Sequence, residues 1–351
     1  DGTSRMYIKI SKKSSPAIKK IDITLTDDKG TTDIKTIGKV KYASTQNPNA
    51  YTLDGNYANA NSAGSSSVNI NGDYYFWYVA PDDFTRNAAD ADLSERIVTV
   101  KANITLQNNT TLNLSKNIII VRPPLMLVHG LNGDHTTWDD FLTKDPTVPF
   151  IRDSRFKIVK AVDMEPTAAF KVNSGLLLSE DEKVAGNSFR SLIQSMHKLG
   201  YTCSRLDYVC HSMGGSMVRD AITRYPLSYY YKSNYTAGFC HKIITLGTPH
   251  NGSSYANLLQ DIDNDGYSFV IQPVLESQNL FEKVNFNTYR IVPAVADLRF
   301  ESGVHFKESE VKSHLIFGSL PCVGFNVTTI GLLVLIQNFY DALGDDYVCN
   351  T

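Results

Sequence analysis

The spacing of apolar residues changes once along the chain, and this change limits the fold more than any other feature. From Arg5 to about Val121, apolar and polar residues alternate, most regularly in the segment 97–107. One face of that segment carries Val98, Val100, Ala102, Ile104 and Leu106. Such alternation is typical of half-buried antiparallel strands. Several short strands with turn-rich connections predict that residues 1–121 form a small β-sandwich of the immunoglobulin-like kind, with a spacer or adhesion role.

The second half begins after the consecutive prolines Pro123 and Pro124, which stiffen the chain and end strand pairing. From there, short apolar runs alternate with stretches that have the period of a helix. The segments predicted to contain strands are 125–130, 156–164, 204–210, 241–247 and 312–319. Strands that alternate with helices indicate an α/β fold with an open, mostly parallel sheet in residues 122–351.

Two helices are expected between these strands. The first is predicted to span 179–200, because Ser179 and Glu182 fit a capping box and Gly200 fits the end of a helix. Its apolar face would carry Phe189, Leu192, Ile193, Met196 and Leu199. The second is predicted to begin near Met213 and to stop before Pro226.

The overall composition is that of an ordinary globular protein. The chain has 351 residues, of which 42% are hydrophobic and 20% charged, and its formal net charge is −2. No run of like charges occurs, so neither nucleic acid nor an anionic membrane is expected as the main partner. The longest apolar run, Ile330 to Ile336, is too short to span a bilayer.

The chain begins with Asp1-Gly2, without an apolar leader, and we interpret it as a processed or trimmed chain. The tyrosine-, asparagine- and serine-rich composition favours an extracellular or cell-surface location. The five cysteines show no metal-binding spacing. Cys322 and Cys349 bracket an apolar segment, and a disulfide between them is an open alternative in an oxidising compartment.

A serine lies where the predicted strand 204–210 meets the helix that begins at Met213. The stretch C-H-S-M-G-G places Ser212 at this junction. A tight strand-to-helix turn lifts a hydroxyl clear of the sheet and directs free helix amides at developing negative charge. The pattern expected for such a nucleophile is G-x-S-x-G, and here Cys210 replaces the first glycine while Gly214 supplies the second.

Two further motifs flank this serine in sequence. An apolar strand ends in H-G-L-N-G, residues 129–133, and another ends in L-G-T-P-H-N-G, residues 246–252. Together with C-H-S-M-G-G they resemble the lipase and esterase branch of the α/β-hydrolase family, over about 124–254. The resemblance implies that Ser212 is the nucleophile and that the amides of Leu131 and Met213 form the oxyanion hole.

The same resemblance implies other roles. His129 and His250 would be structural members of their motifs rather than the catalytic base. Lid or insertion segments would lie at 251–310 and 322–343. The apolar stretch 323–343 would be either an interfacial segment that contacts lipid or a buried helix.

The acid and the base of a catalytic triad are harder to place. The sequence A-L-G-D-D-Y-V resembles the acid turn of the family, with Asp346 as the acid and Asp345 as the alternative. The family order is serine, acid, histidine, and no histidine follows Asp346. Three interpretations stay open: the natural protein continues beyond Thr351, Asp297 works with His305 or His314, or the base is lost.

One acidic loop fits part of a calcium-binding pattern. Asp261, Asp263 and Asp265 occupy the first, third and fifth positions of a calcium loop, but Gln272 stands where a glutamate is expected. The alternatives are a structural calcium site and an acidic surface loop. No other cofactor is expected.

The motifs together predict a lipase-like carboxylic ester hydrolase that forms an acyl-enzyme on Ser212. Its expected partner is an ester or lipid substrate, met at a lipid surface through the insertion segments, and its oligomeric state is left open. Two alternatives remain: a surface adhesion or binding protein that retains the scaffold without the chemistry, and an acyltransferase.

Overall fold

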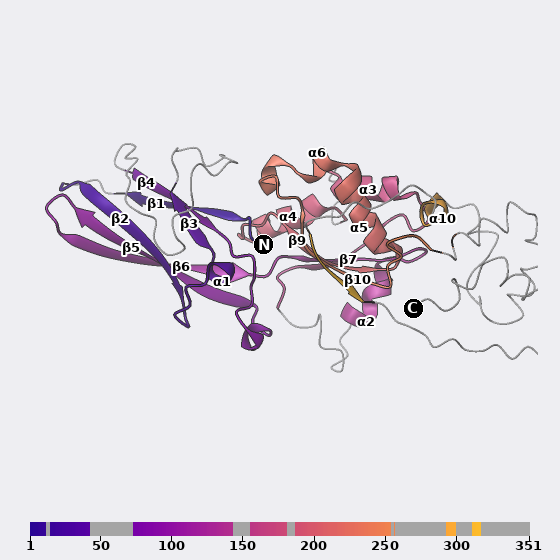
Figure 1. Cartoon of the computed structure of the whole chain (residues 1–351), viewed down its shortest axis with the longest axis horizontal. Helices are drawn as coiled ribbons and strands as arrows, with labels where there is room; N and C mark the ends of the chain where they lie inside the picture. The colour runs from indigo at the N-terminus through magenta and orange to yellow at the C-terminus, as the bar shows by residue number, and fades with distance from the viewer. Residues whose placement is uncertain are drawn as a thin grey trace, which may run out of the picture.

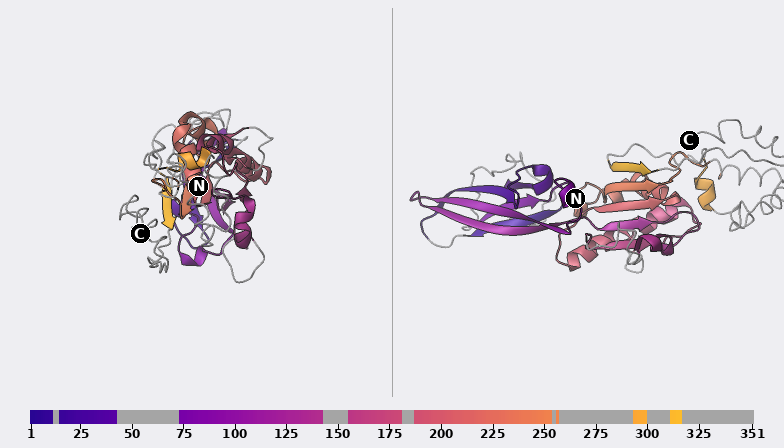
Figure 2. Two further views of the ribbon diagram at one scale, coloured as in Figure 1. Left: turned by 90° about the vertical axis from the view of Figure 1, so that its right-hand side faces the viewer. Right: turned by 90° about the horizontal axis from the view of Figure 1, so that it is seen from below.

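A computed structural model describes residues 1–11, 15–42, 73–142, 155–180, 187–253, 256, 293–299 and 311–316. Two halves lie end to end along the long axis of the molecule (Figure 1). The first contains two antiparallel sheets, and the second contains one parallel sheet with helices against it. The right-hand view of Figure 2 shows the same arrangement from below.

The antiparallel half has three strands in each sheet within the described residues. One sheet has the order β1 (Arg5–Ser11), β4 (Asp73–Val79), β3 (Lys39–Tyr42); the other has the order β2 (Ile18–Asp27), β5 (Glu95–Leu106), β6 (Thr111–Val121). Two short helical turns, α1 (Ile34–Ile37) and η1 (Ala88–Asp90), connect them. Every second residue of β5 from Arg96 to Leu106 is buried, as the alternation predicts. The immunoglobulin-like topology stays a prediction.

The second half contains a parallel sheet, which confirms the predicted α/β fold class for this part of the chain. The strand order is β11 (Lys312–Ile316), β10 (Cys240–Leu246), β9 (Leu206–His211), β7 (Leu125–Val128), β8 (Val159–Val162). Each of the five strands overlaps a segment where the apolar runs predict one, although β9 ends one residue later and β10 begins one residue earlier than predicted. All four residues of β7 are buried, because both faces of the sheet are covered there.

Most helices lie on one face of this sheet (Figure 1). The helices of this half are α2 (Asp139–Leu142), α3 (Phe170–Leu178), α4 (Phe189–Lys198), α5 (Met213–Arg224), α6 (Pro226–Tyr229) and α10 (Pro293–Asp297), with 3-10 turns η2 (His135–Trp138) and η4 (Lys232–Asn234). Met126, Val128 and Tyr208 pack with α3, α4 and α5 in one core cluster. Leu125, Leu127 and Val209 point to the opposite face and pack with Trp138.

The predicted start of the first helix is wrong. Ser179 does not begin a helix but is the extended C-cap of α3. The next helix, α4, begins at Phe189, and its capping box joins Ser188 and Ser191. The Ser188 hydroxyl accepts the N–H of Ser191 at 3.3 Å, which satisfies a free amide of the first turn and marks the start of the helix. Glu182 lies outside the described residues.

The predicted end of that helix is confirmed. Gly200 has φ of 87°, and its N–H donates to His197 O at 2.9 Å. The N–H of Tyr201 donates to Met196 O at 3.1 Å. These two bonds form a Schellman motif, in which glycine adopts the left-handed conformation at little cost.

Helix α3 is not predicted, because Asn173 and Ser174 interrupt its apolar repeat. Both are fully buried, and both are satisfied by hydrogen bonds. The Asn173 side chain bonds the backbone N–H and C=O of Glu165, and the Ser174 hydroxyl donates to Asp220 at 2.5 Å. Part of the buried face of α3 is therefore polar, whereas the buried face of a helix is usually apolar.

The two halves meet at the amino ends of the parallel strands. His241, the second residue of β10, contacts Asp82 and Asp207, and Lys242 bonds Asp83 at 2.9 Å. Further ion pairs and hydrogen bonds across this junction include Lys312–Asp82, Lys157–Glu95, Arg155–Asp92 and Thr3–Ser204. These contacts surround one edge of the sheet and leave the other edge to the loops that follow the strands.

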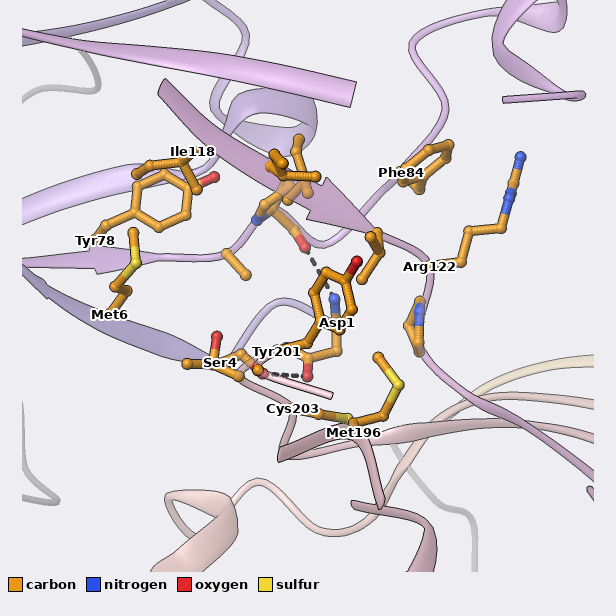
Figure 3. A pocket seen from close by; sticks show the side chains of 18 of the residues that line it. Asp1, Ser4, Met6, Tyr78, Phe84, Ile118, Arg122, Met196, Tyr201 and Cys203 are labelled. Carbon is orange, nitrogen blue, oxygen red and sulfur yellow. Dashed lines mark hydrogen bonds between the residues drawn. The ribbon is translucent and has the colours of Figure 1, made fainter. Parts of the chain in front are cut away.

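A cavity of about 390 Å³ lies at this junction (Figure 3). Met6, Tyr78 and Ile118 line it from the antiparallel half, and Met196 and Cys203 line it from the parallel half. Among the described residues, none of those predicted to act in catalysis lines this cavity. Within the described residues, no helix has both the length and the apolar character that a membrane crossing requires.

Candidate active site

Ser212 lies in a strained turn between β9 and α5. It precedes the first residue of the helix and has φ of 51° and ψ of −129°, a conformation that non-glycine residues rarely adopt. Its N–H donates to Leu246 O at 2.9 Å, and its C=O accepts from Gly215 N at 3.2 Å. The turn therefore has the strand-to-helix strain expected of a nucleophile, and backbone bonds hold it.

Two glycines allow the backbone to approach this turn closely. A Cβ added at Gly214 would lie 2.5 Å from the carbonyl oxygens of Val128 and His129. A Cβ added at Gly130 would lie 2.7 Å from the Cβ of Ser212. Because backbone atoms and the serine itself fill these spaces, any side chain at either glycine would push the loop after β7 away from Ser212.

Cys210, which replaces the first glycine of the expected pattern, does not disturb the turn. Its side chain is fully buried in the core between the sheet and the helices. Burial raises the pKa of its thiol, so the side chain behaves there as a small apolar group.

The two predicted oxyanion donors flank Ser212. Met213 is the first residue of α5, where an N–H has no partner within the helix. Leu131 follows Gly130 in the turn that Gly133 closes by donating to Gly130 O at 3.2 Å. Within the described residues, neither amide has a backbone acceptor. The geometry leaves both free for a ligand, and their role in an oxyanion hole stays a prediction.

His129 is buried, and both of its ring nitrogens are occupied. Met164 N donates to Nε2 at 3.0 Å, so Nε2 carries no hydrogen. The hydrogen must then be on Nδ1, which lies 2.9 Å from Gly130 O and donates to it. His129 is therefore a neutral ring that fixes the loop after β7, and it has no free nitrogen to accept a proton from Ser212.

His250 is held in a similar way in the loop that follows β10. Arg219 Nη1 lies 3.0 Å from Nδ1, and Thr245 Oγ1 lies 3.0 Å from Nε2. Burial and, secondarily, the charge of Arg219 lower the pKa of His250 to about 4. The ring is neutral near pH 7, and both nitrogens are engaged away from the Ser212 hydroxyl.

No base contacts the Ser212 hydroxyl within the described part of the chain. The histidines described are His129, His135, His197, His211, His241, His250 and His314. His135 bonds Asp163 at 2.7 Å, and His197 bonds Cys203 O at 2.8 Å. His211, next to the serine, is exposed, and burial of part of its ring lowers its pKa. His305 lies outside the described residues.

The candidate acids separate into two groups. Asp345 and Asp346 lie outside the described residues. Asp297 is described, and its carboxylate accepts the N–H of Phe170 at 2.6 Å, at the start of α3. No hydrogen bond joins it to His314, which is exposed in β11. Asp297 therefore stabilises the start of helix α3. The sequence does not show this role, because Asp297 and Phe170 are far apart in the chain.

The other sequence predictions lie outside the described residues in whole or in part. Those wholly outside are the calcium candidates Asp261, Asp263 and Asp265, the segment 322–343, and Cys322 and Cys349. The segment 251–310 is described only at 251–253, 256 and 293–299. The structure does not test these predictions.

Residues 125–262 match a family model described as "Putative serine esterase (DUF676)". This part of the chain is therefore similar to a family of serine esterases. The match begins at the first residue of β7 and contains all three motifs around Ser212. No curated protein sequence matches the chain.

Several solved structures of lipases and esterases share weak similarity with the chain. A Bacillus licheniformis lipase in its propeptide form is 20% identical, with a TM-score of 0.32 over 51% of this chain and 30% of that one. Lipase 1 of Pelosinus fermentans is 14% identical, with a TM-score of 0.27 over 51% and 62%. The rice cell wall degrading esterase LipA of Xanthomonas oryzae is 12% identical, with a TM-score of 0.30 over 75% and 84%. The chain thus spans less than two thirds of the first two enzymes.

Proposed function

We propose that this chain is a serine hydrolase that cleaves carboxylic esters, with a lipase-like preference, through an acyl-enzyme on Ser212. The observation that carries the proposal is the strained Ser212 turn, against which Gly130 and Gly214 bring the loop after β7. The match of residues 125–262 to a serine esterase family supports the same chemistry. An accessible hydroxyl beside two free amides is the arrangement that acyl transfer requires.

In this mechanism Ser212 Oγ attacks the ester carbonyl and forms a tetrahedral intermediate. The amides of Leu131 and Met213 would donate to its oxyanion, and collapse would expel the alcohol and leave the acyl-enzyme. Water would then release the acid. A histidine oriented by Asp346 would take the Ser212 proton and return it to the leaving alcohol. Without that histidine, binding and the oxyanion hole alone would give about 10³–10⁴-fold acceleration over water.

The rival function is binding without hydrolysis, and the absence of a base beside Ser212 Oγ among the described residues favours it. An acyltransferase would form the same acyl-enzyme and pass the acyl group to an alcohol rather than to water. In either case we propose an exported protein whose antiparallel half is a spacer. Contact with lipid through 251–310 or 322–343 and a structural calcium ion at Asp261, Asp263 and Asp265 are further proposals.

A labelled fluorophosphonate separates the two functions, because it reacts with an activated serine in the absence of any particular substrate. We expect the full-length protein to be labelled and Ser212→Ala to be unlabelled. Ser216→Ala is the matched control, since Ser216 lies one turn later in α5 and its buried hydroxyl has no hydrogen-bond partner among the described residues. Absence of labelling in the full-length protein would overturn the proposal.

Substrate tests then refine the assignment. Hydrolysis of p-nitrophenyl esters of increasing acyl length would distinguish an esterase from a lipase. Added alcohol would divert product to a new ester if the protein is an acyltransferase. Equal loss of all these activities in Ser212→Ala, with Ser216→Ala unchanged, is the expected result.

A further inference from the structure

The loop after β10, residues 247–253, is bonded at both ends to neighbouring elements. Gly247 N donates to Ile316 O at 2.8 Å, which ties the start of the loop to β11. Ser253 N donates to Leu298 O at 2.7 Å, just after α10. Within the loop, Gly252 N donates to Pro249 O at 3.1 Å. The loop therefore has a fixed backbone around His250.

The side chains of Arg219, His250 and Thr245 join this loop to α5 and β10, and we name these three residues the histidine brace. The Arg219 guanidinium can only donate, so Nδ1 of His250 accepts at 3.0 Å. The hydrogen of the neutral ring is then on Nε2, which donates to Thr245 Oγ1 at 3.0 Å. Only the neutral ring makes both bonds.

The brace lies against the helix end that carries the predicted oxyanion donor Met213. A Cβ added at Gly215 would lie 2.4 Å from Thr248 Oγ1 and 2.9 Å from Thr245 Cγ2, so the first turn of α5 packs directly on these two threonines. Arg219 lies one helical turn further along the same face. The brace and the threonines thus hold the first two turns of α5 against β10 and its loop.

We propose that His250 is a positioning residue, which with Arg219 and Thr245 sets the place of the Met213 amide relative to Ser212. The inference rests on the proposed esterase function, because it assigns the brace an effect on the oxyanion hole. His250 does not touch the reacting atoms, and it acts through α5. Misplacing a donor by about 1 Å costs on the order of 100-fold in rate, so a brace at this position would affect kcat.

The charges around His250 make the brace sensitive to acid. Among the described residues, Arg219 of α5 is the charged group that faces the ring, and Thr245 of β10 is neutral. Protonation would place two cations at the 3.0 Å contact and remove the lone pair that accepts from Arg219. The pKa of about 4 places this loss well below neutral pH.

Three variants test the brace in the full-length protein. His250→Leu removes both bonds, and His250→Asn keeps an acceptor for Arg219 that acid does not protonate. Arg224→Leu is the matched control, because Arg224 stabilises the same helix by pairing with Asp220 at 2.8 Å and does not contact the loop. We expect His250→Leu to lower kcat for a p-nitrophenyl ester by about 10- to 100-fold with KM within about 2-fold. His250→Asn should recover most of this loss, and Arg224→Leu should lower the melting temperature with little change in kcat.

Hydrogen exchange of the peptide that spans 211–219 gives a readout that needs no activity. The amides of this peptide should exchange faster in His250→Leu than in Arg224→Leu, when the two variants are compared under conditions that give them the same free energy of unfolding. If the wild-type protein neither hydrolyses esters nor reacts with a fluorophosphonate, the esterase proposal fails while the exchange data still test the brace. Equal exchange in the two variants, or wild-type kcat in folded His250→Leu, would overturn the positioning role.

Discussion

The two ends of β10 each hold a histidine, and their protonation requirements are opposite. At the amino end, His241 Nδ1 lies 2.7 Å from Asp207 Oδ1, and Nε2 lies 2.9 Å from Asp82 O. Both oxygens are acceptors, so only a ring with a hydrogen on each nitrogen can donate at both contacts. Just past the carboxyl end, His250 accepts from Arg219, and its ring must be neutral.

The difference follows from what each edge of the sheet does. The amino edge joins the two halves through ionised groups, among them Asp82, Asp83, Lys242 and Lys312. The carboxyl edge holds the strained Ser212 turn, and there a charged ring would compete with the proposed oxyanion donors, the amides of Leu131 and Met213. A single strand thus separates a charged junction from the proposed active-site edge, where His250 holds a neutral ring.

The largest expected effect comes from closing the space at the carboxyl edge. In Gly214→Ala the added Cβ would lie 2.5 Å from two backbone carbonyl oxygens, which cannot rotate away. We expect loss of fluorophosphonate labelling and destabilisation by about 3 kcal/mol, the upper end of the usual cost of overpacking. Gly175→Ala in α3 is the control, because a Cβ there has no neighbour within 4 Å. It should leave labelling intact and raise stability by about 0.5–1 kcal/mol in denaturant unfolding.

Breaking the charged edge should have the next largest effect and should spare the chemistry. His241→Leu leaves the half-buried Asp207 carboxylate without its hydrogen-bond donor, and we expect about 2 kcal/mol of destabilisation. The rate of fluorophosphonate labelling of the folded protein should not change, since the junction lies at the opposite edge. An equal loss of labelling rate and stability would show that the two edges are coupled.

Acid should weaken the two edges in different pH ranges. The pKa of His250 falls from 6.5 in the unfolded chain to about 4 in the folded protein. The unfolded chain therefore binds a proton first, and stability is lost as pH falls from about 6.5 to 4. Hydrogen bonds from His241 and Lys312 hold the pKa of Asp82 well below its usual 3.8, so its contribution is lost only below that range. The difference in free energy of unfolding between wild type and His250→Asn, measured as a function of pH, should therefore change only between about pH 6.5 and 4.

The smallest effect is expected from the exposed ion pairs of the junction. Lys242→Ala removes a pair with Asp83 whose side chains are 38% and 36% exposed. Such pairs contribute about 0.2–1 kcal/mol and are screened by salt. The variant should melt within a few degrees of wild type, and the difference should shrink in 1 M salt. A salt-independent loss would mean that packing rather than charge holds this part of the junction.

Local patterns predicted most of the strands in the described residues and the Ser212 turn. The alternating segment around Val98 and the continuous apolar run of β7 indicate buried strands by their own residues. No knowledge of the neighbouring strand is needed to predict them. The glycines around Ser212 also predicted a tight turn, because such a turn needs small residues in any fold. Strand β3 was not predicted, because it is only four residues long and two of them are lysines, Lys39 and Lys41.

What the patterns missed depends on partners far away in sequence. Helix α3 buries Asn173 and Ser174, and this is tolerated because Glu165 and Asp220 satisfy them. Asp297 accepts from Phe170, which lies 127 positions earlier in the chain. His241 Nε2 contacts the backbone oxygen of Asp82, 159 positions earlier, so no local motif could show that its ring faces two acceptors. Such contacts arise from topology, and local sequence patterns do not reveal them.

The opposite placement of the junction and the Ser212 turn on one sheet gives the molecule a polarity. The strands rise about 3.3 Å per residue, so the seven residues of β10 place the turn about 20 Å from the antiparallel half. A molecule immobilised or displayed through that half would present its Ser212 edge outward. Fusing a tag or a carrier protein to the antiparallel sheets should therefore leave access to the serine open, which makes this end of the molecule the natural handle for engineering.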